Sequence, residues 1–353
     1  MTMTQATTVQ NLVRPPAVFD SNEPDAFVTA LRSPWTALIA ELYDVILATT
    51  GEYARSRGLR GFPLPLTTRS VTCPTALGSD SEPVPVTVAG VRTYLPDSLQ
   101  FALEYGCRLT PDGCFVIAPS FRGEPADQTH LNQYTHSEAE IPGGLDDLTG
   151  YVDGYVGALS GAILERLGGR LAATRGDVSH LERMAGRASF EQLTFDEAAR
   201  VVADVDGGVR DEGTWRTLTR AGERALMERV SEFVWVRHYD ALAVPFYQAF
   251  EDPDGRTARN ADLLFGPGEI VGSGERHEDA QTLRKSMALH NVREEDYAWY
   301  VRMVEAFPRR TSGFGMGVER FLMWVLRHDD IRDIPVISRV NEPLEFPSAV
   351  VRP

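Results

Sequence analysis

The chain has 353 residues, which is enough to bury a large core in one big domain or two smaller ones. Hydrophobic residues make up 43% and charged residues 24%, an ordinary globular composition. The formal net charge of -15 argues against a broad nucleic-acid surface, which needs clustered Lys and Arg, although it leaves room for a local basic patch.

Cysteine content and hydropathy indicate the compartment. Cys73, Cys107 and Cys114 have no paired zinc spacing, and three cysteines cannot all pair with one another. No run of 18 apolar residues occurs, and the first ten residues have no signal-peptide pattern. We therefore expect a reduced, cytoplasmic protein that has no membrane contact.

The N-terminal part predicts an arm followed by a long helix. Residues 1–32 are polar and contain prolines, which favours a flexible or draped arm. Ser33 and Pro34 are typical of a helix N-cap and first helical position, and apolar residues follow at helical spacing. The helix should end near Arg57-Gly58, and the next segment, LRGFPLPL, should be extended.

The middle of the chain alternates strands and helices. Strands are expected at Val84–Val88 and Val91–Leu95, then at Phe115–Glu124 and His130–Glu140 around a polar loop. Because strand side chains alternate, the second pair should present its polar residues together: Arg122 and Glu124 from one strand, and Tyr134, His136, Glu138 and Glu140 from the other.

The following segments complete the predicted architecture. Helices are expected at Asp146–Leu167 and Thr219–Arg229, on either side of a variable acidic insertion at about 168–212 that carries a short helix at Thr194–Ala203. Strands are expected at Glu232–Val236 and Pro245–Phe250. Together these elements predict an α+β fold, with a mainly antiparallel sheet flanked by helices.

Two later stretches carry candidate ligand-binding residues. Asp262 and Glu269 flank a Gly-Pro-Gly turn, so they can either hold magnesium against ATP phosphates or cap the turn. The stretch Thr311–Met323 alternates glycines before Glu319 and Arg320. It suits a strand on which a flat ligand lies against bare backbone, with a tight turn as the plainer alternative.

Three ordered motifs resemble the class II aminoacyl-tRNA synthetases. They are Phe-Arg-x-Glu at Phe121–Glu124, His-Leu-x-x-Tyr-Thr-His-x-Glu-Ala-Glu at His130–Glu140 and Gly-Phe-Gly-x-Gly-x-Glu-Arg at Gly313–Arg320. Asparaginyl-tRNA synthetase and the archaeal asparagine synthetase related to it are the most similar members. The resemblance runs from about Ser33 to about Pro347 and implies a catalytic domain at 33–353, with the 33–66 helix and strand forming a homodimer interface.

The resemblance also implies a site for ATP and Mg²⁺. Arg122 would bridge the substrate carboxylate and the α-phosphate, and Tyr134 and Arg320 would enclose adenine. Arg122 and Arg320 would be catalytic, Asp262 and Glu269 would hold magnesium, and the remaining ATP contacts would come from Glu124, His130 and Gly317.

An amino-acid pocket is implied as well. Ser98, Gln100 and Glu138 match residues that hold the α-ammonium group, and Arg276 matches the residue that binds the substrate side chain. Aspartate-specific relatives have lysine at the place of Leu103, and asparaginyl enzymes have Glu at the place of Glu104. The plainer alternative for the stretch from Ser98 to Glu104 is an amphipathic helix start.

Departures from the family pattern affect the part that faces tRNA. The loop before His130 reads Asp127-Gln128-Thr129, where relatives carry arginine, and Gln133 replaces the usual Glu. The sequence also has no room for the N-terminal anticodon-binding domain of relatives. We therefore expect an AMP-forming ligase that activates asparagine, aspartate or an analogue and passes it to ammonia or another amine rather than to tRNA. A truncated asparaginyl or aspartyl tRNA ligase, asparagine-synthetase-like amidation of aspartate, and a non-catalytic regulatory paralogue are the alternatives. The sequence does not identify the acceptor or the carboxylate that is activated.

Overall fold

A computed structural model of the chain describes residues 15–16, 25–73, 75–77, 79 and 81–337. Most of the expected N-terminal arm, and the last residues of the expected domain, lie outside these ranges. Within the arm, Ala26–Arg32 forms helix α1.

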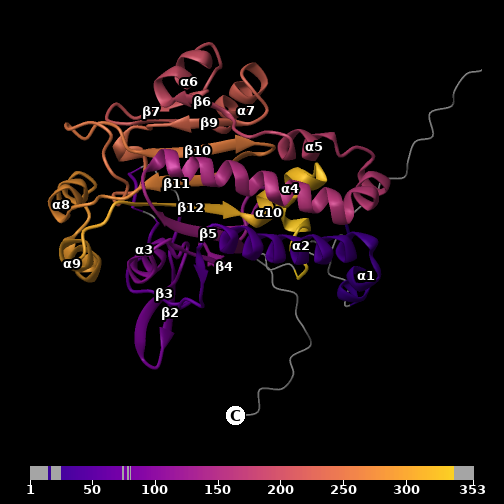
Figure 1. Ribbon diagram of the computed structural model, residues 1–353, viewed down its shortest axis with the longest axis horizontal. Helices are drawn as coiled ribbons and strands as arrows, with labels where there is room; N and C mark the ends of the chain where they lie inside the picture. The colour runs from indigo at the N-terminus through magenta and orange to yellow at the C-terminus, as the bar shows by residue number, and fades with distance from the viewer. Residues whose placement is uncertain (1–14, 17–24, 74, 78, 80, 338–353) are drawn as a thin grey trace, which may run out of the picture.

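An eight-stranded sheet forms the centre of the molecule (Figure 1). Its strand order is β1-β4-β5-β12-β11-β10-β9-β6, and every neighbouring pair is antiparallel except β1–β4 and β6–β9. The predicted α+β class and its mainly antiparallel sheet are thereby confirmed. The strands are β1 (Arg60–Gly61), β4 (Cys114–Phe121), β5 (Gln133–Pro142), β6 (Glu191–Thr194), β9 (Val234–Arg237), β10 (Asn260–Phe265), β11 (Gly268–Glu275) and β12 (Thr311–Gly317), with separate hairpins β2 (Val84–Val88) with β3 (Val91–Leu95) and β7 (Val209–Asp211) with β8 (Arg216–Leu218).

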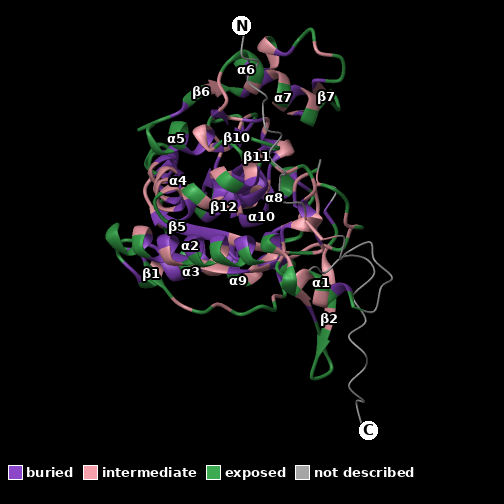
Figure 2. Cartoon of the chain, turned by 90° about the vertical axis from the view of Figure 1, so that its right-hand side faces the viewer, coloured by how far each residue is buried: buried purple, intermediate pink, exposed green. Residues whose placement is uncertain are grey.

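Long helices α2 and α4 pack against each other and run along one face of the sheet (Figure 1). Their apolar side chains join those of the central strands and of α10 in the main core, and Figure 2 shows this buried interior. The helices are α2 (Pro34–Ser56), α3 (Gln100–Leu109), α4 (Leu145–Arg175), α5 (Ser179–Ala185), α6 (Phe195–Val201), α7 (Arg220–Arg229), α8 (Ala280–Leu289), α9 (Ala298–Ala306) and α10 (Val318–Leu326).

Strand β12 shows how the sequence divides the two faces of the sheet. Phe314 and Met316 point into the core, and the ring centres of Phe314 and of Tyr155 on α4 lie 5.7 Å apart. Gly313 and Gly315 alternate with them and therefore face the other side, where they line a cavity. The missing side chains leave room on that face for other polar groups, since Glu140, Gln100 and Arg276 lie against Gly313.

Most predicted elements occur close to their expected bounds. The hydroxyl of Ser33 accepts a hydrogen bond from Trp35 N at 3.2 Å and starts α2, and Gly58 ends it at φ +86°. The predicted strand at Pro245–Phe250 is wrong as a regular strand. It makes only isolated bridges, such as Gln248 with Arg276, because Pro245 cannot donate to a ladder and the segment turns after it.

The expected insertion is more integrated than its composition indicated. Helix α4 continues through its first residues to Arg175, and β6 extends the main sheet parallel to β9. Within the described residues, no helix combines the length and apolar character needed to cross a lipid bilayer.

Candidate active site

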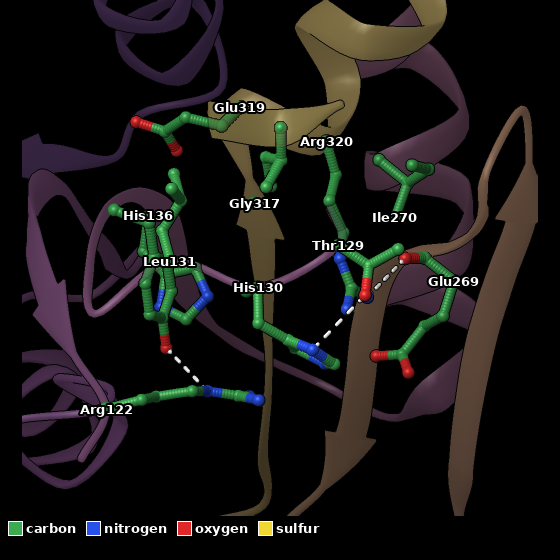
Figure 3. Close-up of a pocket in the computed structure, with 13 residues that line it drawn as sticks. Arg122, Thr129, His130, Leu131, His136, Glu269, Ile270, Gly317, Glu319 and Arg320 are labelled. Atoms are coloured by element: carbon green, nitrogen blue, oxygen red, sulfur yellow. Dashed lines mark hydrogen bonds between the residues drawn. The ribbon is translucent and has the colours of Figure 1, made fainter. Parts of the chain in front are cut away.

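Three adjoining cavities lie on the glycine-bearing face of the sheet, and Arg122 and Glu269 line all three of them. The first is drawn in Figure 3. The cavities together form a continuous set of subsites that runs from a cationic end to a polar, buried end.

The cationic end contains the residues predicted to bind ATP. Arg122 Nε donates to the Tyr134 hydroxyl at 3.1 Å, and its guanidinium lies 5.7 Å from the centre of that ring. Arg320 Nη1 donates to the carbonyl of Glu269 at 3.0 Å, which fixes the second arginine across the same cavity (Figure 3). His130 and Gly317 also line this cavity. Two fixed arginines beside an aromatic ring can bind an anionic, ring-bearing ligand.

Glu124 differs from the other predicted ATP ligands because it lines none of the three cavities. Its carboxylate lies 3.6 Å from Arg122 Nη1 and accepts a hydrogen bond from the Glu82 backbone at 3.0 Å. It therefore helps to orient Arg122 without facing the cavities itself.

Helix α10 is anchored so that Arg320 projects into the cavity. Glu319 accepts hydrogen bonds from the Tyr43 hydroxyl at 2.8 Å and from Thr135 N at 2.9 Å. These contacts join α10 to α2 and β5. The Glu-Arg pair of the third motif thus divides into a positioning residue and a ligand-facing residue.

The two predicted metal ligands converge over Gly272. A Cβ at this glycine would lie 2.9 Å from Glu269 Oε1 and 3.9 Å from Asp262 Oδ1. Burial raises the pKa of Asp262 well above its ordinary value, and the charges of Glu269 and Glu223 raise it further. Crowded carboxylates of this kind fit a divalent cation. Among the described residues, no three His, Cys, Asp or Glu side chains are arranged to hold a metal ion, so phosphate or water oxygens would complete its shell.

Glu223 is a member of this group that the sequence analysis missed. It lies on α7 and lines the cavity with Arg220, Glu269 and Arg320. Burial and the charge of Glu269 raise its pKa to about 7. Its only sequence signal is a position one helical turn after Arg220.

The buried end contains an anion suited to an ammonium group. Glu138 accepts hydrogen bonds from Ser98 Oγ at 2.5 Å and from Leu99 N at 2.8 Å. Burial raises the pKa of Glu138, but these bonds and the adjacent His136 outweigh burial and lower it below its ordinary value. Glu138 therefore stays ionised in a cavity that Ser98 and Glu138 both line.

Arg276 is completely paired on one side. Its Nε and Nη2 bind the Glu140 carboxylate at 3.2 and 2.9 Å, and Nη2 also donates to Gln100 Oε1 at 2.6 Å. Gln100 in turn donates to the Phe314 carbonyl at 2.8 Å. The structure thus places Gln100 as an orienting partner of Arg276, while the sequence analysis had assigned it to the α-ammonium group. Glu140, which the sequence places on the same strand face as Glu138 without a role, is thereby the ion-pair partner of Arg276.

The structure does not place Glu104 at the cavity. Its carboxylate binds Arg108 Nη1 at 3.0 Å and the Tyr300 hydroxyl at 2.7 Å, and it lines none of the three cavities. Leu103 is completely buried and also absent from their walls. Gln100, the first residue of α3, lines the cavity, whereas Glu104 lies one helical turn further along.

The fold and the site define a class II aminoacyl-tRNA synthetase domain. The family described as tRNA synthetases class II (D, K and N) matches residues 28–340. The chain belongs to this family, and the predicted resemblance is confirmed.

Individual relatives give a more specific comparison. The asparagine–tRNA ligase of Clostridium botulinum is 29% identical over 244 residues, which cover 66% of this chain and 52% of the relative. A probable cytoplasmic asparagine–tRNA ligase of Encephalitozoon cuniculi is 27% identical and covers 71% of this chain and 56% of its own length. The chain therefore spans about half the length of these curated relatives. The structure of asparaginyl-tRNA synthetase from Pyrococcus horikoshii complexed with asparaginyl-adenylate has a TM-score of 0.81 at 24% identity. It covers 91% of this chain and 72% of that structure's chain, and it shows the shared fold.

Proposed function

We propose that the protein is an ATP-dependent, AMP-forming ligase that activates asparagine or a close analogue and transfers the acyl group to a non-tRNA amine. The observation that carries this proposal is the continuity of the subsites: Arg122 lies where the cationic and the amino-acid-binding cavities meet. An amino acid whose ammonium group is held at Glu138 and whose side chain is held at Arg276 would then place its carboxylate beside a phosphate held at Arg122 and Arg320.

The chemistry consists of two transfers. A carboxylate oxygen of the amino acid attacks the α-phosphorus of ATP, and pyrophosphate leaves. The amine nitrogen then attacks the acyl carbon, the amide bond forms, and AMP leaves. Arg122 would hold the carboxylate and the α-phosphate together and offset their repulsion. Asp262 and Glu269 would hold Mg²⁺, which supplies charge neutralisation for the phosphates when it is bound.

The paired state of Arg276 favours a neutral substrate side chain. Arg276 contributes one positive charge and Glu140, which binds it bidentately, contributes one negative charge. A second carboxylate brought into this buried site would be under-paired, and this is costly. Asparagine is therefore a better substrate than aspartate in this proposal. Amidation of aspartate, as in the asparagine synthetase-like alternative, requires Glu140 to be neutral.

The loop before His130 supports an acceptor other than tRNA. The Asp127 carboxylate accepts hydrogen bonds from Thr129 N at 2.7 Å and from His130 N at 2.8 Å. Burial raises the pKa of Asp127, but these bonds outweigh burial and hold it well below its ordinary value. The loop thus keeps a negative charge at neutral pH, and its residues Asp127-Gln128-Thr129 offer no cation of their own to a tRNA phosphate.

A tRNA ligase is the second candidate function, because the curated relatives are asparagine–tRNA ligases. A cytoplasmic location fits both candidates, since the three cysteines are all free.

The two functions are separated by one set of assays. Pyrophosphate exchange with a panel of amino acids first identifies the activated substrate. The adenylate is then offered ammonia, small amines or total tRNA, and amide products are measured by mass spectrometry. Amide formation without tRNA charging is expected. Charging of tRNA without amide products would reject the proposal, and absence of exchange with every amino acid would reject both functions.

A further inference from the structure

Gln248 lines the cavity that also contains Ser98, Glu138 and Arg276, and no motif singles it out. It follows Pro245 in the segment that was wrongly predicted to be a strand, and its backbone bridges to Arg276. Its side-chain carbonyl oxygen is closed off from solvent and has no hydrogen-bond partner among the described residues. A buried polar atom without a partner is rare in proteins and calls for an explanation.

The position of this oxygen follows from two paired glycines. Gly274 on β11 and Gly313 on β12 lie directly opposite each other, so their side-chain positions share one face of the sheet. A Cβ at Gly274 would lie 3.0 Å from Gln248 Oε1, and a Cβ at Gly313 would lie 2.7 Å from Arg276 Nη2. The Gln248 carboxamide and the Arg276 guanidinium therefore occupy neighbouring places on the cavity floor.

Arg276 has a hydrogen-bond donor, and Gln248 a hydrogen-bond acceptor, that no group of the described chain uses. Arg276 uses Nε and Nη2 on Glu140 and Gln100, while Nη1 makes no hydrogen bond within the described part of the chain. It is available to donate to a carbonyl oxygen. Gln248 Oε1 is available to accept from an N–H. A carboxamide carries one of each, whereas a carboxylate carries only acceptors.

We propose that Gln248 is a specificity-determining residue that accepts a hydrogen bond from the side-chain NH₂ of a carboxamide amino acid, beside Arg276. This inference rests on the proposed function for the identity of the bound substrate. Gln248 adds a direct hydrogen bond to the substrate NH₂, whereas the Arg276–Glu140 ion pair makes the neighbouring wall of the cavity electrically neutral.

Binding measurements test this contact without requiring catalysis. Isothermal titration calorimetry with L-asparagine and L-aspartate is carried out on the wild-type chain, on Gln248→Met and on Gln248→Glu. Methionine keeps the unbranched length of glutamine and lacks the acceptor, and glutamate keeps an acceptor. The matched control is Gln281→Met, at an exposed glutamine in the first turn of α8.

Gln248→Met should weaken asparagine binding by about 10- to 100-fold and change aspartate binding by less than about threefold. Gln248→Glu should retain most of the asparagine affinity, and the control should behave like wild type. A purely structural role would weaken both amino acids equally. That result would overturn the inference, as would unchanged asparagine affinity in Gln248→Met or failure of the wild-type chain to prefer asparagine.

The outcome is separable from the proposed function. If asparagine binds through Gln248 but no exchange or amide product is found, the ligase proposal fails and this inference stands. If amide products form from an amino acid without a carboxamide, the ligase proposal stands and this inference fails.

Discussion

At the residue scale, Arg122 is the side chain on which activation depends most in the proposed function. It is held by Tyr134 and supported by Glu124, so its guanidinium is already oriented for two anions. Arg122→Ala should lower the rate of pyrophosphate exchange by about two to three orders of magnitude, because the lost contact acts mainly in the transition state. Exchange kinetics and melting temperature are to be measured together.

The control for Arg122 is Arg92→Ala, which removes an exposed arginine from hairpin β2–β3. It should leave the exchange rate unchanged. An active Arg122→Ala protein, or an inactive control, would show that the assigned role of Arg122 is wrong.

Glu140 gives the substrate preference a dependence on pH. Burial raises its pKa from 4.5 to about 7, although Arg276 opposes this shift. Ionised Glu140 neutralises Arg276 above pH 7, whereas protonated Glu140 leaves the arginine charge uncompensated below it. The preference for asparagine over aspartate should therefore fall by roughly tenfold between pH 8 and pH 6. Exchange rates for both amino acids across this range provide the measurement.

The raised pKa of Glu140 also makes the stability of the folded protein depend on pH. Because the folded pKa of Glu140 lies above its unfolded value, this group favours the folded state at low pH, and the contribution is lost as pH rises through about 7. Glu140→Gln should remove both dependences. A preference that stays constant with pH in the wild-type chain would contradict this account of Glu140.

At the element scale, the hairpin of β10 and β11 concentrates negative charge. The pKa of Asp262 is raised by burial and by the charges of Glu269 and Glu223, so its ionised form is unfavourable in the metal-free fold. Asp262→Asn should stabilise the metal-free protein by about 0.5–2 kcal/mol while abolishing Mg²⁺-dependent exchange. Denaturant melts with and without Mg²⁺ and ATP measure both effects.

An exposed acid provides the comparison for Asp262. Glu251→Gln, outside the three cavities, should leave exchange unchanged. A less stable Asp262→Asn protein would show that the carboxylate is compensated within the chain and that the hairpin is not built around a cation.

At the scale of the whole molecule, charge opposes binding of tRNA. The net charge is -15, and the loop at Asp127–Thr129 adds a fixed anion beside the cavity that Arg122 and Arg320 line. Total tRNA incubated with the protein, ATP and labelled asparagine should acquire no acid-precipitable label, and filter binding at physiological salt should be weak. Label that appears with the wild-type chain and disappears with Arg320→Ala would establish the tRNA ligase instead.

Association of two chains through the 33–66 segment is a further prediction for the whole molecule. The apolar stripe of α2 is already buried within the chain, so the stripe itself does not require a partner. Leu47 and Leu66 remain 51% and 41% exposed. Light scattering at micromolar concentration should give twice the mass of one chain, and Leu66→Glu should reduce it. A monomeric wild-type protein would reject the interface.

The sequence by itself determined most of the central strands, the long helices α2 and α4, and the arginines predicted to face a ligand. Strand alternation and glycine spacing are local, so Gly313, Gly315 and Arg320 could be assigned to a ligand-bearing face from neighbouring residues alone. The caps of α2 were likewise readable from Ser33 and Gly58. These features depend on backbone geometry over a few neighbouring residues, so they can be predicted from the local sequence.

Only the tertiary structure decided which side chains share a charge or a hydrogen bond. Glu140 and Arg276 are 136 positions apart, and they meet because β5, β12 and β11 are neighbours in the sheet. Glu104 lies outside the predicted pocket because its carboxylate binds Arg108 and Tyr300. Gln248 lines the cavity because its segment turns instead of continuing as a strand. Hydrogen bonds and ion pairs act over a few ångströms, so their partners are set by packing between distant segments.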